Sequence, residues 1–88
     1  MFTTSEKSYT EIVSITFLPI GLLRSFAKGA ERLILEGKEG QSIEVVCKEI
    51  GLSINLVSLF LVNGKPRSKD YLLQPHDEVK LIALVGGG

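Results

Sequence analysis

Residues Glu78 to Gly88 read EVKLIALVGGG and join an apolar, strand-like run directly to three glycines. The run alternates between two faces, as a β-strand does. The face predicted to point inward carries Val79, Leu81 and Ala83, and the outward face carries Lys80, Ile82 and Leu84. Because glycine has no Cβ, residues 86–88 are predicted to be a flexible tail that fits where no other residue can. Taken alone, such a tail is more typical of a frayed end or an added linker.

The composition predicts one small domain. Eighty-eight residues, 44% of them hydrophobic, are enough for a single modest core. Ten basic and ten acidic residues cancel, so the charge indicates neither a nucleic-acid partner nor an anionic membrane. The single cysteine excludes an internal disulfide and fits a reducing compartment. No apolar leader is present, and no apolar run approaches the ~20 residues of a membrane span. We therefore predict a cytoplasmic protein with no membrane partner.

The first third of the chain is predicted to contain two strands. Glu11 to Leu18 alternates apolar with polar residues, and Pro19 is predicted to end this strand because proline cannot donate to a sheet ladder. Glu31 to Glu36 is predicted to be the second strand, with Leu33 and Leu35 on one face and Arg32, Ile34 and Glu36 on the other. The connection from Pro19 to Ala30 contains glycines and allows at most a short helical turn. Residues 1–10 are polar and lack periodicity, so they are predicted to be a flexible leader.

A helix is predicted from Ser42 to Ile50. Ser42 is a good N-cap residue, and Gly51 stands where a left-handed residue ends a helix. The apolar stripe at helical spacing consists of Ile43, Val46, Cys47 and Ile50. Cys47 is therefore predicted to face the core, where burial raises the pKa of a thiol and weakens it as a nucleophile. We interpret it as a structural cysteine rather than a reactive one.

The second half of the chain begins with its most apolar run, Val57 to Val62, which is predicted to be a central strand. Asn63 and Gly64 follow, and this pair is a strong signal for a tight hairpin. Lys65 to Arg67 is predicted to be the short return strand, confined to a sheet edge by its proline. With the final strand and one amphipathic helix, the pattern predicts a two-layer α+β domain.

The residue types needed for catalysis are not gathered in any recognisable pattern. His76 is the only histidine, and Cys47 is predicted to be buried, so no zinc ligand set can be assembled. No serine or cysteine nucleophile has a base in a known spacing, and the glycines do not form a phosphate-binding loop. We predict that the chain binds no metal and is not an enzyme.

Three short motifs and the order of the elements together resemble one family. The motifs are VNGK at Val62 to Lys65, DEV at Asp77 to Val79 and VGGG at Val85 to Gly88. They resemble the ubiquitin-like sulfur carriers of the MoaD/ThiS type over nearly the whole chain. This resemblance implies the β-grasp fold, a mixed sheet of four to five strands packed on one main helix. The expected domain covers residues 11–85, and the glycine tail covers residues 86–88.

The resemblance also implies a function for the terminal carboxylate of Gly88. In the family, a ubiquitin-activating-type adenylyltransferase adenylates the last glycine, and sulfur transfer then produces a thiocarboxylate. Gly87 and Gly88 match the family's diglycine, and Gly86 extends it. ATP and magnesium would be used by that partner, so no cofactor is expected on this chain.

The expected sulfur acceptor is a molybdopterin synthase large subunit, because the long connection between the first two strands resembles that subgroup. Three alternatives remain open at this stage. One is sulfur donation to the thiazole of thiamine or another acceptor, and another is a ubiquitin-like modifier conjugated through Gly88. The last is an interaction module with an inert tail.

The family's partner surface implies a docking patch on the outer sheet face. The residues expected there are Leu59, Leu61, Lys80, Ile82 and Leu84. Exposed together, such apolar side chains mark an interaction site. The alternative is that the connection from Pro19 to Ala30 folds over them.

The sequence departs from the family pattern at two places. His76 stands where the family usually has glycine before DEV, so an altered turn is expected. Ala83 and Leu84 stand where proline is common before the diglycine.

Overall fold

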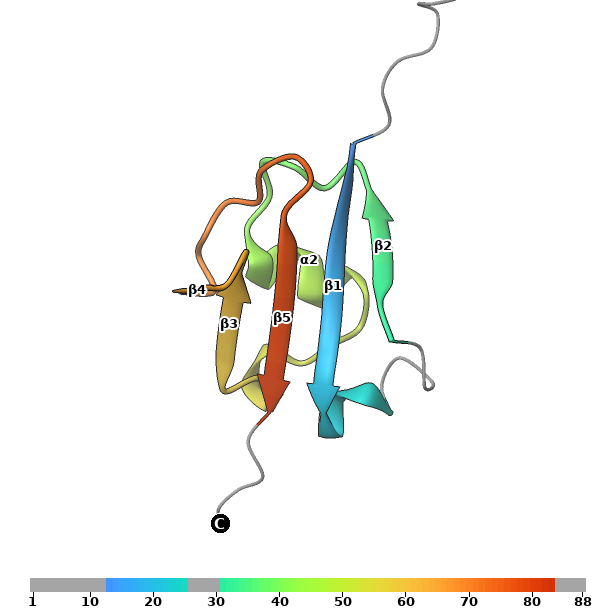
Figure 1. Ribbon diagram of the computed structural model, residues 1–88, viewed down its shortest axis with the longest axis vertical. Coiled ribbons are helices and arrows are strands. Elements are labelled where there is room, and N and C mark those ends of the chain that lie inside the picture. The colour runs from blue at the N-terminus through green and yellow to red at the C-terminus, as the bar shows by residue number, and fades with distance from the viewer. Residues whose placement is uncertain (1–12, 26–30, 84–88) are drawn as a thin grey trace, which may run out of the picture.

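The computed structural model describes residues 13–25 and 31–83, which form one sheet packed on one α-helix (Figure 1). The strands lie in the order β2-β1-β5-β3-β4. The elements are β1 (Ser14–Gly21), the 3-10 turn η2 (Leu22–Arg24), β2 (Leu33–Glu36), α2 (Ile43–Glu49), the 3-10 turn η3 (Ile54–Leu56), β3 (Leu59–Val62), β4 (Lys65–Arg67) and β5 (Glu78–Ala83). This is the predicted two-layer α+β arrangement.

The middle strand of the sheet is β5, with β1 parallel on one side and β3 antiparallel on the other (Figure 1). The prediction that the run Val57 to Val62 is central is therefore wrong, since β3 lies one strand away from the edge. Its high apolar content has a different cause. Phe60 and Val62 face the core, while Leu59 and Leu61 lie on the opposite, outer face.

Strand β1 is longer than predicted, because it continues through Pro19 to Gly21. The backbone N–H of Thr16 donates to the carbonyl of Asp77, 3.0 Å away, so even-numbered residues of β1 direct their N–H groups toward β5. The nitrogen of Pro19 therefore points to the β2 side, where pairing has already ended at Phe17. Proline is tolerated there because no ladder hydrogen bond is lost.

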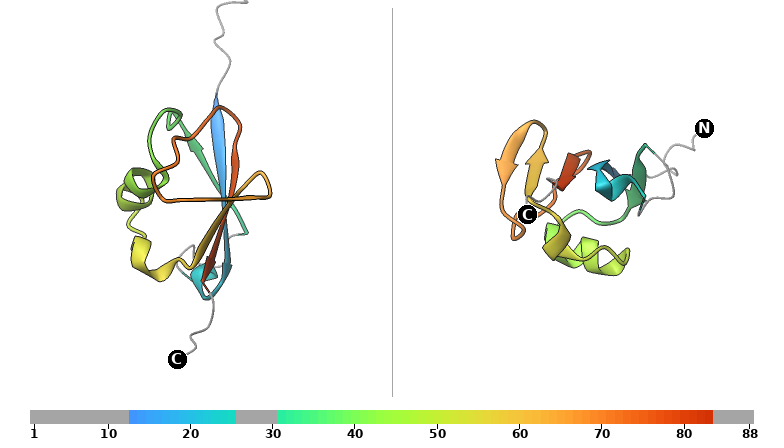
Figure 2. Two further views of the ribbon diagram at one scale, coloured as in Figure 1. Left: turned by 90° about the vertical axis from the view of Figure 1, so that its left-hand side faces the viewer. Right: turned by 90° about the horizontal axis from the view of Figure 1, so that it is seen from below.

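Helix α2 covers one face of the sheet, as both views of Figure 2 show. The hydroxyl of Ser42 accepts a hydrogen bond from the backbone N–H of Val45 at 3.1 Å, which confirms the predicted N-cap. Gly51 follows the helix with φ 84°, the left-handed conformation expected of a terminating glycine. The buried stripe of α2, consisting of Ile43, Val46 and Cys47, is fully inaccessible to solvent.

The hairpin between β3 and β4 has the predicted tight turn. Asn63 and Gly64 have φ values of 52° and 86°, and Val62 pairs with Lys65 across the turn. Strand β4 lies at the sheet edge with Pro66 in its middle, also as predicted.

The core lies between the inner sheet face and α2. Its buried hydrophobic residues are Ile15, Phe17, Leu23, Ile43, Val46, Cys47, Leu52, Phe60, Val62, Leu73, Val79 and Leu81. Leu33 and Leu35 of β2 both pack against this cluster, so they share one face of the strand as predicted. Within the described parts of the chain, no helix is long and apolar enough to cross a membrane.

Candidate functional site

Strand β5 determines where the last residues of the chain leave the domain. Its pairing runs to Ala83, which lies opposite Gly21 of β1. Leu84 and the predicted tail residues Gly86, Gly87 and Gly88 lie outside the described residues. Because β5 is the middle strand, the chain beyond Ala83 starts from the centre of one end of the sheet (Figure 1).

A row of three apolar residues crosses the outer face at that same end. Ile82 of β5 pairs with Leu59 of β3 on one side and with Ile20 of β1 on the other. Leu59 is 36% exposed, and the other two are half-buried. Helix α2 covers the opposite face of the sheet (Figure 2). An apolar strip thus lies directly beside the point where the last residues begin.

The next row along the outer face has a positive charge in its middle. Lys80 of β5 pairs with Leu61 of β3 and with Leu18 of β1. These three residues are half-buried. We call the two rows together the outer patch, which consists of Leu18, Ile20, Leu59, Leu61, Lys80 and Ile82.

The structure brings together Leu59, Leu61, Lys80 and Ile82, four of the five residues predicted as a docking surface. Their role as partner contacts stays a prediction. Sequence reasoning missed Ile20, because Pro19 was expected to end the strand. It also missed Leu18, which lies inside the predicted strand but was not considered for the outer face. The available signal was their position, since both continue the even-numbered face of Ser14 and Thr16.

The alternative that the connection after β1 covers the outer patch concerns residues 22–30, of which the structure describes residues 22–25. In its described part, Leu23 of η2 is 3% exposed and belongs to the core cluster. This side chain therefore points into the core rather than over the patch. Residues 26–30 lie outside the description.

The start of β5 is held by a buried carboxylate that sequence reasoning did not single out. Asp77 is 4% exposed and accepts three hydrogen bonds, each of 2.8 Å. The donors are Asn63 Nδ2, the hydroxyl of Tyr71 and the backbone N–H of Gln74. Asn63 also accepts a hydrogen bond from the backbone N–H of Glu78 through its Oδ1. The NG and DEV motifs are thus two halves of one hydrogen-bonded joint.

His76 shows why glycine suits the position before DEV. Its φ is 67°, in the left-handed region that disfavours most residues with a Cβ and suits glycine. A histidine thus occupies a left-handed position in this chain. The expected difference of this turn from that of the family stays a prediction.

The remaining candidate groups are the Cys47 thiol and possible metal ligands. Burial raises the pKa of the Cys47 thiol to about 11, which keeps it protonated near neutral pH. Among the described residues, no group of three histidines, cysteines or carboxylates is placed to hold a metal ion. The features with functional promise are therefore the outer patch and the residues that follow β5.

Comparison with known proteins identifies the fold. No protein-family model matches the chain, and no curated protein matches its sequence significantly. Its structure is similar to the crystal structure of SAMP1 from Haloferax volcanii, with a TM-score of 0.65 and 17% sequence identity. The match covers 85% of this chain and 99% of that one. The chain has the ubiquitin-like β-grasp fold, as the resemblance implied.

Proposed function

We propose that this chain is a sulfur carrier whose Gly88 carboxylate is activated and converted to a thiocarboxylate by partner enzymes. The observation that carries the proposal is the position of β5. This central strand ends beside an apolar strip, so a partner that binds the strip lies next to Ala83, five residues before Gly88 in the sequence. The GGG sequence adds the chemical reason, because a chain without side chains can enter a narrow active site.

The proposed chemistry begins with a carboxylate, which is a poor electrophile. Its oxygen attacks the α-phosphate of ATP, pyrophosphate leaves, and an acyl-adenylate of Gly88 forms. A sulfur nucleophile from a donor then displaces AMP, which leaves a thiocarboxylate. ATP and magnesium belong to the adenylyltransferase, and the carrier contributes the tail and the docking surface. Enclosure of the tail would also exclude water from the acyl-adenylate.

The outer patch is the proposed docking surface for the adenylyltransferase and for the sulfur acceptor. Apolar strips flanked by polar groups are typical of protein interfaces. The adenylyltransferase and the sulfur acceptor would bind one after the other, because each needs Gly88 in its own active site.

We propose a molybdopterin synthase large subunit as the acceptor. The support is the long connection between β1 and β2, residues 22–32, which resembles the carriers of that pathway. The thiazole of thiamine is the competing acceptor. A large subunit that forms product with the thiocarboxylated chain, while a thiazole synthase does not, would establish the first acceptor.

Intact mass spectrometry tests the carrier chemistry. The chain is incubated with an activating enzyme, ATP, magnesium and a sulfur donor. We expect a gain of ~16 Da, the exchange of one oxygen for sulfur. Trypsin cleavage after Lys80 should place this gain on the peptide 81–88.

Two control variants sharpen this test. Deletion of Gly87 and Gly88, which removes the diglycine terminus, should abolish the gain. Cys47→Ala should retain it, because sulfur bound to the thiol would be a different product. Conjugates to lysines of other proteins would instead establish a modifier. An unchanged mass with an enzyme that activates a related carrier would overturn the proposal.

A further inference from the structure

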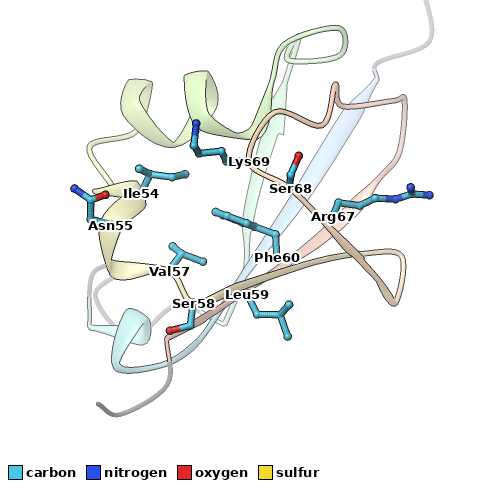
Figure 3. A pocket seen from close by; sticks show the side chains of 9 residues that line it. All are labelled: Ile54, Asn55, Val57, Ser58, Leu59, Phe60, Arg67, Ser68 and Lys69. Carbon is cyan, nitrogen blue, oxygen red and sulfur yellow. The ribbon is translucent and has the colours of Figure 1, made fainter. Parts of the chain in front are cut away.

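A groove on the helix side of the sheet is not used by the proposed sulfur chemistry. It has a volume of about 430 Å³ and lies between η3, β3 and the residues after β4 (Figure 3). Figure 3 shows the side chains of Leu59 and Phe60 on opposite sides of β3. The floor of the groove thus lies on the face opposite the outer patch, and the two surfaces meet at Leu59, which belongs to the patch and also lines the edge of the groove.

The floor of the groove is apolar. Phe60 is 8% exposed, and the half-buried side chains of Ile54 and Val57 stand beside it. In Figure 3 these three side chains surround one space. The space suits an apolar side chain from a ligand, whose burial against Phe60 would be favourable.

Two cationic side chains, those of Arg67 and Lys69, line the groove, and no carboxylate residue among those described lines it. Because the carboxylates of Glu44 and Asp70 lie against Lys69, the attraction for an acidic ligand rests on Arg67. The Arg67 guanidinium lies 5.5 Å from the centre of the Tyr71 ring, which holds it by a cation–π contact. No carboxylate of the described residues lies within ion-pair distance of Arg67. Figure 3 shows this side chain extending away from Ile54 and Val57, so its planar fork of N–H groups can bind a carboxylate only at that outer end of the groove.

Lys69 is already paired, but weakly. Its Nζ lies 3.1 Å from Oε1 of Glu44 and 3.6 Å from Oδ1 of Asp70. The side chains of Lys69 and Glu44 are 48% and 44% exposed, and exposed pairs of this kind contribute little to stability. An incoming carboxylate can therefore replace Glu44 at small cost.

We propose that this groove binds a short acidic segment of a partner protein. One apolar side chain of the segment inserts among Ile54, Val57 and Phe60, and an adjacent Asp or Glu carboxylate pairs with Arg67. The groove is open, so it would cover little of a small molecule, whereas an extended segment adds contacts on both sides of the inserted residue. This site is independent of the Gly88 chemistry.

Peptide display tests the proposal directly, because a random library needs no identified partner. A seven-residue library, fused so that its peptides have no free carboxyl terminus, is selected on the full chain. The double variant Arg67→Glu, Lys69→Glu serves for counter-selection. We expect enriched peptides with Asp or Glu next to a large apolar residue. Synthetic versions with blocked ends should perturb the amide resonances of Ile54, Val57 and Phe60. The double variant should weaken their binding by about tenfold or more.

Lys65→Glu is the matched control, because it reverses a charge on β4 outside the groove and should change affinity less than about twofold. Amide spectra of both variants show whether the fold is intact, and Arg67→Gln offers a milder change if the double variant unfolds. The proposal is overturned if selected peptides lack acidic residues, bind the variants equally or perturb the outer patch instead. It is also overturned if removal of residues 84–88 alone shifts the groove resonances, since the chain's own terminus would then be the occupant.

Discussion

At the residue scale, Asp77 contributes most to the position of β5. Three donors from different parts of the chain converge on its buried carboxylate, and Asn63 links the same joint to Glu78. A buried carboxylate is stable only when such donors satisfy it. Removal of the acceptor leaves the side chains of Asn63 and Tyr71 without their partner.

We therefore expect Asp77→Ala to lower the free energy of unfolding by about 2–4 kcal/mol, because buried donors lose their acceptor. Urea unfolding followed by circular dichroism measures the change. Asp70→Ala is the control, since this side chain is 76% exposed and its loss should cost less than about 0.5 kcal/mol. Equal effects of the two substitutions would contradict the role assigned to Asp77.

The Cys47 thiol should be inert in the folded chain. Its pKa is raised to about 11 by burial, so the reactive thiolate is scarce at pH 8. We expect alkylation by iodoacetamide at pH 8 to be at least about a hundredfold slower than in urea, where the pKa returns toward its ordinary value. Because the folded-state pKa is the higher one, stability is retained below about pH 9 and declines as the pH rises toward 11. Rapid alkylation of the native chain would show that Cys47 is accessible.

At the element scale, local patterns predicted the elements well and their ends less well. Ser42 and Gly51 mark the two ends of the helix as expected. Their effect is predictable because a cap acts on backbone groups close to it in the sequence. The end of β1 could not be predicted in this way. Whether Pro19 breaks a strand depends on which neighbour its nitrogen faces, and that is decided by the register with β2 and β5. The same error hid Ile20 from the predicted docking surface.

The proposed role of the outer patch in docking predicts the effect of a substitution on β3. We expect Leu59→Gln to reduce kcat/KM for adenylation by about tenfold, because a central apolar contact would be lost from the interface. Leu72→Gln is the matched control, since Leu72 is 55% exposed and lies away from β3 and β5. Steady-state pyrophosphate release measures both variants. If Leu59→Gln retains full activity with an unchanged fold, the adenylyltransferase does not dock on this strip.

At the scale of the whole molecule, the sheet separates three tasks. Its inner face forms the core with α2, its outer face carries the apolar strip, and its central strand leads to the glycines. Sequence alone could not predict which strand is central, since strand order depends on contacts between distant segments. Apolar content pointed to β3, but β5 is the middle strand of the five and contributes two fully buried residues, Val79 and Leu81.

This division predicts that stability and function separate sharply along the last strand. A chain that stops at Val85 retains all of β5, so its free energy of unfolding should stay within about 0.5 kcal/mol of the full chain. A chain that stops at Val79 loses Leu81 and most of the pairing on both sides of the sheet centre. We expect this shorter chain not to fold, because removal of one buried leucine side chain alone costs about 2–5 kcal/mol. Circular dichroism and urea titration of the two truncations test the contrast. A marked loss of stability in the chain that stops at Val85 would mean that the glycines are part of the folded domain. The proposal that the Gly88 carboxylate is free to react would then fail.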